Sequence, residues 1–561
     1  MFSNMHKFWS FILTISFVAI IFACAKQTSP TGGPKDTIPP RLINSQPSHQ
    51  ALNARPRTIT LEFNEHIILA NPKEQIIITP DIQKKYEITA KRTRVIIQLE
   101  NPLDSNTTYS INFRDAIQDI TEKNPARNLR LAFSTGNYID SLSISGTVRD
   151  LTQNKEIKDA TVALYQSDTF NIFKHKPIYL TKTNDKGQYS IENLKHGIYY
   201  VYAFDDKNRN LIVDSKTEMY AFKSDSLYLD QSVDNINLHA IKLDARTLTL
   251  TSARPNNTYF NIRTSKGLAD YEVLSSQNDT LYTTFGEDRT NVRIYNSFPE
   301  RDSTAIQFLA RDSIGNQIDT TLYVKFNQRQ VTPESFSVKL NQTALLGRTA
   351  RVTANATFSK PIVDTNYDSA IIQLDSATAV AFLPDEITID NKNRKIEFQK
   401  TIPRTHLRTE ATTPQQVAQS QTAGPQPTIT FYLGRTTFIS IEKDSSAVIT
   451  QPLRPLYYED TGIIITSVNT DSPAWIIQLL DKSNNVIRQV VNQKQVTFND
   501  LPPGEYLLRA IDDADANGIW TPGNFFEKRE PEMIFYYSND KNVPLINLKA
   551  NFELGPLLIT F

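Results

Sequence analysis

Residues 188–206 read QYSIENLKHGIYYVYAFDD, and residues 495–513 read QVTFNDLPPGEYLLRAIDD. Apolar and polar residues alternate in both stretches, which is the pattern of strands that bury one face. The glycine in each stretch, Gly197 or Gly504, stands at the turn between two such strands. The alignment continues without a gap from 188–214 to 495–521, so we expect one β-module to occur twice in the chain.

The same alternation recurs elsewhere and predicts a chain that is nearly all β. Ile59, Leu61 and Phe63, for example, alternate with polar residues, as a half-buried strand requires. No long helical periodicity follows the apolar run at the start of the sequence. A length of 561 residues indicates several domains. We therefore expect tandem β-sandwiches.

Composition excludes some classes of partner and of fold. The chain has 60 Lys and Arg residues and 60 Asp and Glu residues, and its basic residues form no concentrated run. A nucleic-acid partner would need a basic face, so none is expected. Cys24 is the only cysteine, so the sandwiches are held by their cores and not by disulfides.

The N-terminus resembles a bacterial lipoprotein signal. Lys7 precedes an apolar run over residues 8–23, which is shorter and more polar than a membrane-spanning helix. Residues 21–24 read Ile-Phe-Ala-Cys and resemble the lipobox. The resemblance implies cleavage before Cys24 and acylation of that cysteine, with palmitate among its chains. It predicts a signal peptide at 1–23 and a lipidated tether at 24–40.

The residues after the cysteine indicate a location. Ala25 stands where lipoproteins kept in the inner membrane often carry Asp, which favours the outer membrane. Residues 25–35 contain no acidic residue of the kind that sends some lipoproteins to the cell surface, so the periplasmic face is favoured over it. Proline and glycine deny the tether regular structure.

The first domain, expected at 41–137, resembles the bacterial Ig-like domain of the S-layer type. The resemblance is carried by Leu-Glu-Phe-Asn-Glu at 61–65, Asn-Thr-Thr-Tyr at 106–109 and Phe-Ser-Thr-Gly at 133–136. It implies a small β-sandwich that serves as a spacer or binding module. Glu62 and Glu65 suggest a catalytic acid–base pair only superficially; we interpret them as surface residues of a strand and its exit turn.

The second and last domains, at 140–245 and 456–561, resemble the carboxypeptidase regulatory-like, transthyretin-like sandwich. In the second domain, Asp185-Lys186-Gly187 supplies a tight hairpin between two strands. The resemblance implies a non-catalytic accessory domain. Between the two copies, we expect a β-sandwich at 246–328 and an Ig-like β domain at 329–455. A Thr-, Gln-, Ala- and Pro-rich stretch at 404–427 predicts a flexible loop within the latter.

The acidic loop that ends the repeat is the strongest chemical candidate. Asp513, Asp515 and Asn517 stand two positions apart before a glycine, a spacing that supplies oxygen ligands to Ca²⁺, and either Thr521 or Asn524 offers another oxygen. The bidentate glutamate expected at the twelfth position is replaced by Asn524. The alternative is an Asx-rich turn whose side chains bind their own backbone.

The other copy of the loop is a weaker calcium candidate. Lys207 and Arg209 oppose a cation there, and Leu211 takes the place of the glycine. The oxygen-bearing residues in this copy are Asp206, Asn208, Asn210 and Asp214.

These features favour a non-catalytic lipoprotein that acts as a structural or interaction scaffold in the cell envelope, within an assembly or secretion complex. A carbohydrate-binding accessory lipoprotein is the alternative; it predicts aromatic side chains grouped on one sandwich face. Trp520 and Tyr506 are candidates for such a shelf, but packing in a core or at its rim is favoured for both. A hydrolase with an unrecognised site is the third, and it predicts a deep pocket with converging carboxylates.

Overall fold

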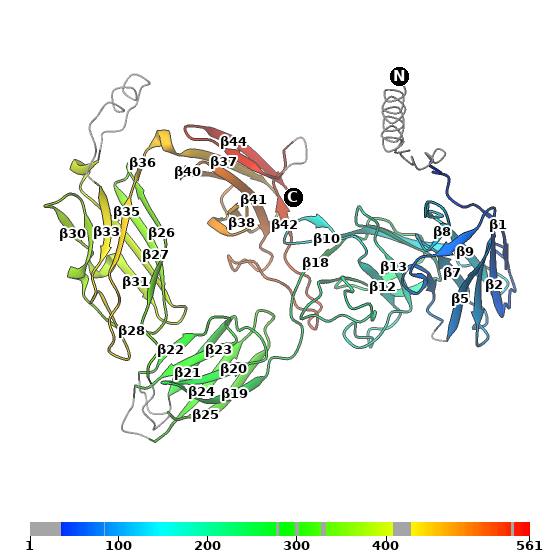
Figure 1. Cartoon of the computed structure of the whole chain (residues 1–561), viewed down its shortest axis with the longest axis horizontal. Helices are drawn as coiled ribbons and strands as arrows, with labels where there is room; N and C mark the ends of the chain where they lie inside the picture. The colour runs from blue at the N-terminus through cyan, green and yellow to red at the C-terminus, as the bar shows by residue number, and fades with distance from the viewer. Residues whose placement is uncertain are drawn as a thin grey trace, which may run out of the picture. The chain divides into compact units, whose positions relative to one another are not determined.

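The computed structural model describes residues 35–82, 85–275, 280–297, 302–326, 332–407, 428–539 and 544–561 (Figure 1). The chain divides into two compact units, of which the first ends at Leu142 and also takes in 192–195, and the second holds the remainder. The signal peptide 1–23, the acylation site Cys24 and most of the tether lie outside the described residues. Among the residues described, no helix is long and apolar enough to cross a membrane.

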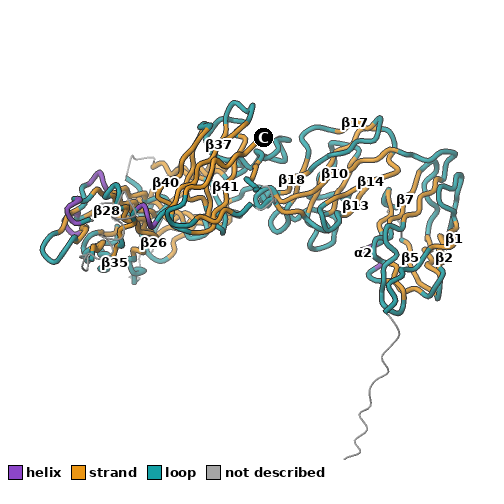
Figure 2. The backbone as a smooth tube through the Cα atoms, turned by 90° about the horizontal axis from the view of Figure 1, so that it is seen from above, coloured by secondary structure: helices purple, strands orange, loops and turns teal. Residues whose placement is uncertain are grey.

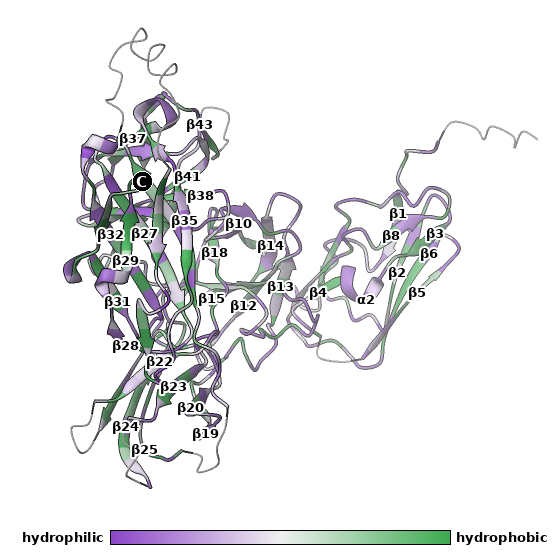
Figure 3. Ribbon diagram, turned by 60° about the vertical axis from the view of Figure 1, so that its left-hand side comes forward, coloured by the Kyte–Doolittle hydropathy of each residue, from purple (hydrophilic) through white to green (hydrophobic). Residues whose placement is uncertain are grey.

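The described residues are almost entirely strands and loops, with a few short helical turns (Figure 2). The predicted all-β fold class is confirmed. Hydrophobic residues run along the strands and hydrophilic ones gather in the loops, as alternation requires (Figure 3). The helical turns are α2 (Pro72–Gln75), η1 (Tyr367–Ser369), η2 (Pro384–Glu386), η3 (Arg404–His406) and η4 (Tyr458–Asp460).

The first unit is a β-sandwich. Its strands are β1 (Leu42–Gln46), β2 (Thr58–Phe63), β3 (Ile67–Leu69), β4 (Ile77–Thr79), β5 (Tyr86–Lys91), β6 (Arg94–Leu99), β7 (Thr108–Asn112), β8 (Ile117–Asp119) and β9 (Arg130–Ser134). One sheet has the order β1-β2-β6-β5 and another the order β4-β7-β9, and β3 pairs with β8. Ile59, Leu61 and Phe63 are all buried in the core between them, as their alternation predicts.

The second sandwich opens the second unit. Its strands are β10 (Leu142–Asp150), β11 (Lys155–Glu156), β12 (Thr161–Tyr165), β13 (Tyr179–Lys182), β14 (Gln188–Leu194), β15 (Gly197–Phe204), β16 (Tyr220–Phe222), β17 (Leu227–Leu229) and β18 (Leu238–Ala240). One sheet runs β11-β10-β14, with β18 parallel to β10. The other runs β13-β12-β15-β16, with β17 also beside β15.

The last sandwich has the same topology. Its strands are β37 (Gly462–Asn469), β38 (Trp475–Asp481), β39 (Val486–Val491), β40 (Gln495–Leu501), β41 (Gly504–Asp512), β42 (Ile534–Tyr536), β43 (Ile546–Leu548) and β44 (Glu553–Thr560). One sheet runs β40-β37-β44, with β44 parallel to β37, and the other runs β39-β38-β41-β42, with β43 beside β41. Each strand of the repeated sequence therefore takes the same place in both copies.

Two further sandwiches lie between these copies in the sequence. The third has strands β19 (Leu250–Asn256), β20 (Tyr259–Thr264), β21 (Asp270–Ser275), β22 (Tyr282–Phe285), β23 (Asn291–Tyr295), β24 (Thr304–Arg311) and β25 (Gln317–Val324). Its sheets run β19-β20-β23-β22 and β21-β24-β25 around a core of their own.

The fourth sandwich is the largest of the modules between the copies. Its strands are β26 (Val338–Leu346), β27 (Arg351–Phe358), β28 (Ile362–Thr365), β29 (Ala370–Gln373), β30 (Ala379–Ala381), β31 (Ile387–Asp390), β32 (Lys395–Thr401), β33 (Ile429–Leu433), β34 (Phe438–Ser440), β35 (Ile449–Leu453) and β36 (Pro455–Leu456). Its sheets run β31-β32-β27-β26-β36 and β30-β29-β33-β35, and β28 pairs with β34. The predicted loop 404–427 begins as the turn η3, and residues 408–427 lie outside the described part.

Candidate metal centre

The acidic loop of the last sandwich leaves strand β41, and its own side chains fold it. The carboxylate of Asp513 accepts hydrogen bonds from the backbone N–H groups of Asn517 (3.1 Å) and Gly518 (3.0 Å). Asp515 Oδ1 accepts from the same Asn517 N–H at 3.2 Å, and Asn517 Oδ1 accepts from the N–H of Ile519 at 2.7 Å. These are Asx turns, so the loop conformation is already specified without an ion.

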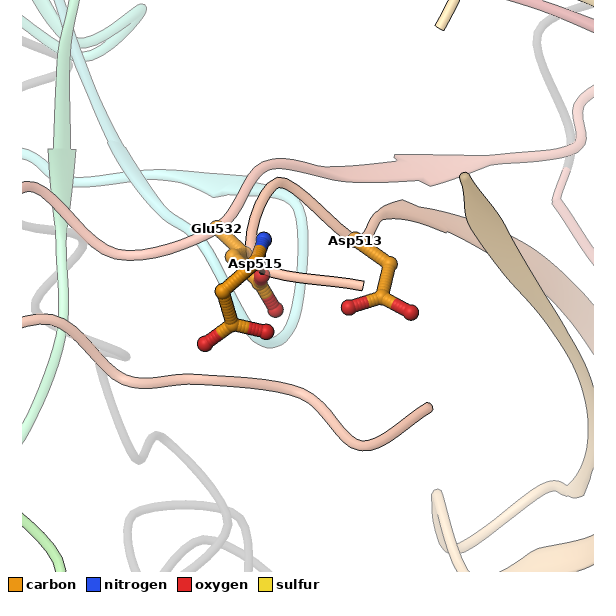
Figure 4. Close-up of side chains that lie close together, drawn as sticks. All are labelled: Asp513, Asp515 and Glu532. Carbon is orange, nitrogen blue, oxygen red and sulfur yellow. Dashed lines mark hydrogen bonds between the residues drawn. The ribbon is translucent and has the colours of Figure 1, made fainter. Parts of the chain in front are cut away.

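Three carboxylates nevertheless converge at this loop. Asp513, Asp515 and Glu532 offer oxygens that all lie within 4.8 Å of one another (Figure 4). Calcium binds oxygens at about 2.3–2.6 Å, so ligands on opposite sides of the ion stand roughly 5 Å apart. Each carboxylate oxygen that accepts one amide keeps a second lone pair. The spacing of this group therefore suits a Ca²⁺ ion.

Glu532 is the member that the sequence did not predict. Its Oε2 accepts from the backbone N–H of Thr521 at 2.8 Å, and its Oε1 from that of Asp515 at 3.4 Å. Asn524, which stands at the twelfth position in the sequence, is engaged elsewhere. Its side-chain amide is buried and donates to the carbonyl of Ile314 in the third sandwich at 2.8 Å.

Asn517 and Thr521, the other two predicted ligands, lie beside the cluster as supports. The Asn517 side-chain amide donates to Thr521 Oγ1 at 3.0 Å, and the Thr521 hydroxyl donates to Asp515 Oδ2 at 2.8 Å. Asn517 Oδ1 already holds the backbone of Ile519. The structure thus places Asp513 and Asp515 in one group, adds Glu532 to it, and leaves Asn517 and Thr521 beside it.

The three carboxylates of the cluster lie close together, so their negative charges repel one another. Burial raises the pKa of Glu532 above its ordinary value. The backbone N–H groups of Thr521 and Asp515 act in the opposite direction, whereas the carboxylates of Asp515 and Asp513 raise the pKa further. A divalent cation would relieve this repulsion, which favours a bound ion on electrostatic grounds.

The loop of the second sandwich has the same construction. Asp206 Oδ1 and Asn208 Oδ1 both accept from the N–H of Asn210, at 3.0 and 3.1 Å. Glu218 takes the part of Glu532: its Oε1 accepts from the Asn208 N–H at 3.4 Å, and its Oε2 from the Asp214 N–H at 2.8 Å. Glu218 was not predicted either, and the repeat could have shown it only if a gap had been allowed in the alignment.

The charge of this second loop differs from that of the last one. Asn208 stands where the last sandwich has an acid, and the carboxylate of Asp214 accepts from the Lys216 N–H and the Thr217 hydroxyl at 3.1 and 3.0 Å. Among the described residues, the three-carboxylate cluster occurs in the last sandwich and not here. The four residues predicted as a weaker site therefore build the loop without assembling a matching ligand set.

An insertion distinguishes the two copies. Glu218 follows Asp214 by four positions, whereas Glu532 follows Thr521 by eleven, so the last sandwich has seven extra residues between these points. The segment 522–531 forms a hairpin, which we call the docking hairpin. The Glu532 N–H donates to the Thr521 carbonyl at 3.0 Å to close its base. Asn524 and Arg529 exchange two backbone hydrogen bonds, of 2.7 and 3.0 Å, nearer its tip.

The docking hairpin packs against the second sandwich. The ring of Phe525 lies 4.9 Å from that of Phe173 and 5.5 Å from that of Phe222. Glu530 binds Lys223 Nζ at 3.1 Å and also accepts from the backbone N–H of Ser224 at 3.0 Å. The cluster of three carboxylates therefore lies at the base of the docking hairpin, which contacts the other copy of the repeat.

The predicted aromatic shelf of Trp520 and Tyr506 does not form. The indole N–H of Trp520 donates to the carbonyl of Glu532 at 3.0 Å, and its ring packs against buried cores. Tyr506 is buried in the core of the last sandwich. In the first unit, Glu62 forms an ion pair with Arg94 at 2.9 Å, as a residue on the surface of a strand does.

The comparisons with known proteins identify one of the modules. Residues 36–135 match the bacterial Ig-like domain family. The Ig-like module thus coincides with the sandwich that its motifs predicted. No curated protein matches the chain.

The chain is also similar to several solved structures, at low sequence identity. BcpA, the major pilin subunit of Bacillus cereus, is 10% identical, with 75% of this chain and 99% of that chain covered and a TM-score of 0.14. The S-layer protein rSbsC(31-844) is 10% identical, with 92% and 68% covered and a TM-score of 0.16. Similarity at this level carries no argument about function.

Proposed function

We propose that this chain is a non-catalytic, lipid-anchored scaffold of the bacterial outer membrane that holds other envelope proteins. The observation that carries this proposal is the hydrogen bonding of the three-carboxylate cluster found among the described residues. Asp513, Asp515 and Glu532 bind the backbone amides of their own loop at the foot of a docking hairpin. These amides hold the carboxylates in place within the loop, which supports a structural role for the site.

The anchor is supported by the sequence. Cys24 follows directly on an apolar run and precedes a Pro- and Gly-rich tether. Each acyl methylene that enters the bilayer contributes about 0.8 kcal/mol, and two chains are enough for stable attachment. A triacylated Cys24 would therefore remain in the membrane, with the sandwiches as spacers and binding modules beyond it.

Cell fractionation of a Cys24→Ser variant tests the anchor. The wild-type chain should be recovered with the outer membrane, and the variant should be recovered in the soluble fraction. Ala25→Ser is the matched control and should stay with the membrane. Cys24→Ser protein that remains membrane-bound would contradict lipid attachment.

Chemical crosslinking in native membranes, followed by mass spectrometry, tests the scaffold role. A scaffold should crosslink reproducibly to a defined set of envelope proteins in near-stoichiometric amounts. A chain that is recovered without crosslinked partners, under conditions that crosslink known envelope complexes, would contradict the role.

We further infer that Ca²⁺ occupies the cluster of Asp513, Asp515 and Glu532 as a structural ion. The oxygen spacing and the repulsion among the carboxylates of the cluster support this inference. Calorimetric titration of chelator-treated full-length chain with CaCl₂ should show a single site. The absence of binding heat at millimolar calcium would contradict it.

A further inference from the structure

A pocket of about 230 Å³ lies where the docking hairpin meets the second sandwich. Phe526, from the hairpin, is 56% exposed at this pocket, which is a large exposure for an apolar ring. Exposed aromatic side chains gathered beside polar groups are typical of binding surfaces. The aromatic residues that line the pocket are Phe170, Tyr200, Tyr202, Phe222, Phe525 and Phe526.

Polar groups of three kinds face the same space. Asp168 supplies a carboxylate, Tyr200 and Tyr202 supply hydroxyls, and Lys528 supplies an ammonium group 5.5 Å from the centre of the Tyr200 ring. Within the described part of the chain, the Asp168 carboxylate and the two tyrosine hydroxyls take part in no hydrogen bond. They are therefore open to a ligand that carries both donors and acceptors.

The hydroxyl of Tyr202 is a donor at physiological pH. Burial, together with the neighbouring Tyr200 and Asp168, raises the pKa of Tyr202 to about 12. The phenol therefore stays protonated, and with the carboxylate of Asp168 it forms a donor–acceptor pair on one wall of the pocket.

The mixture of groups selects one class of ligand. A cation would be attracted by Asp168 but repelled by Lys528, and an anion would meet the reverse. Lys223 also lines the pocket, but Glu530 pairs with its ammonium group at 3.1 Å. A purely apolar ligand would desolvate the polar groups and leave them unpaired, which is costly. A sugar ring has C–H faces that pack on the negative faces of aromatic rings, and its hydroxyls both donate and accept.

The size of the pocket limits how much of a glycan it can hold. Pockets that enclose drug-sized ligands have volumes of roughly 300–1,000 Å³. A volume of about 230 Å³ is smaller than that range, which suits a single ring. We propose that this pocket binds one neutral pyranose ring, such as the end unit of a glycan.

This binding activity goes beyond the scaffold function, and neither Cys24 nor a residue of the acidic cluster lines the pocket. It also gives the alternative of carbohydrate binding a location other than the one predicted. The aromatic group is formed by residues from the loop between β12 and β13, from β15 and β16, and from the docking hairpin, and Trp520 and Tyr506 are packed elsewhere.

Saturation-transfer NMR on the full-length chain in detergent micelles tests the proposal. The neutral probes are the methyl pyranosides of glucose, galactose and mannose, and N-acetylglucosamine. At least one should bind with a Kd on the order of 1 mM, as a ligand of this size in a small pocket allows. Tetramethylammonium and glucuronate, as cationic and anionic probes, should bind at least tenfold more weakly.

Three variants locate the binding. Phe526→Ala should weaken it by about three- to tenfold through loss of one aromatic contact, and Asp168→Asn should weaken it through loss of a charged acceptor. Phe552→Ala is the matched control, because Phe552 is a 53% exposed phenylalanine elsewhere on the last sandwich. Its binding should equal that of the wild type.

Three results would overturn the proposal. The first is that no neutral probe binds the wild-type chain. The second is that tetramethylammonium binds more tightly than any sugar, which would make the pocket a cation cage. The third is that Phe552→Ala weakens binding as much as Phe526→Ala does, which would place the sugar at another surface.

Discussion

At the scale of single residues, Asp515 is the position where one negative charge of the cluster can be removed while the loop keeps its hydrogen bond. Asn at this position keeps the oxygen that accepts the Asn517 N–H and removes one of the three negative charges. We expect Asp515→Asn to remove the stabilisation by calcium. For the wild type, this amounts to about 2.7 kcal/mol at a calcium concentration of one hundred times Kd.

Thermal unfolding with calcium and with chelator measures this effect. The matched control is Asp214→Asn in the second sandwich, where no three-carboxylate cluster forms among the described residues. That variant should keep the full calcium response of the wild type. A wild-type melting temperature that calcium leaves unchanged would contradict the metal site itself.

His239, on β18, predicts a pH dependence of the second sandwich. Burial lowers the pKa of its imidazole, and Lys223 and Arg149 lower it further against the opposing effect of Glu530. Folding thus favours the neutral form of the imidazole ring, compared with the unfolded chain. Its contribution to stability is complete above the ordinary histidine pKa of about 6.5 and is lost as the pH falls from there through the lowered pKa.

Replacement of this histidine should make the stability of the second sandwich less dependent on pH. As the pH is lowered from about 6.5 to about 5, we expect the denaturant concentration at the unfolding midpoint to decrease for the wild type. For His239→Gln it should decrease less over the same pH interval. His196→Gln, on an exposed turn of the same sandwich, should behave like the wild type. Equal slopes for the wild type and His239→Gln would contradict the assignment.

At the scale of elements, the ring of Phe525 makes the main aromatic contacts between the docking hairpin and the second sandwich. Phe525 contacts Phe173, Tyr202, Tyr220 and Phe222. Its replacement by alanine should destabilise this attachment by about 3 kcal/mol through loss of packing. The core of the last sandwich lies apart from Phe525 and should stay folded.

Hydrogen exchange can separate these two effects. In Phe525→Ala, amides of the docking hairpin and of β16 should exchange faster, whereas those of β38 and β41 should keep their protection. Phe552→Ala should change neither set. Faster exchange throughout β38 and β41 would mean that the hairpin belongs to the core of its own sandwich.

At the scale of the whole molecule, the proposed orientation predicts which compartment exposes the chain. A protein on the periplasmic face should resist protease added to intact cells and should be cut once the outer membrane is permeabilised. Immunoblotting of the intact and permeabilised cells measures this, with a known surface protein as the control. Cleavage in intact cells would place the chain on the cell surface.

The carboxylate cluster and the proposed sugar pocket are linked by the docking hairpin, whose base is formed by Thr521 and Glu532 and whose tip carries Phe526. If both proposals hold, chelation should loosen the hairpin and weaken sugar binding by about fivefold or more. Saturation-transfer NMR with and without chelator measures this, and Asp515→Asn should remove the difference. Equal binding in both conditions would show that the two sites are independent.

Sequence alone determined the features that depend on neighbours along the chain. The alternation around Leu61 and the repeat of 188–214 at 495–521 predicted the strands and the shared topology, because side chains of a strand point to opposite faces with a period of two. The spacing of Asp513 and Asp515 predicted an acidic loop, since Asx side chains bind their own backbone within a few residues.

Only the tertiary structure decided which distant residues meet. Glu532 joins the acidic loop from beyond an insertion, and Tyr200 and Phe526 line one pocket although more than three hundred residues separate them in sequence. Trp520 and Tyr506, for which the sequence left both a shared shelf and core packing open, pack in separate clusters. Such meetings depend on how sandwiches pack and where a hairpin docks, and a local pattern of polar and apolar residues does not encode them.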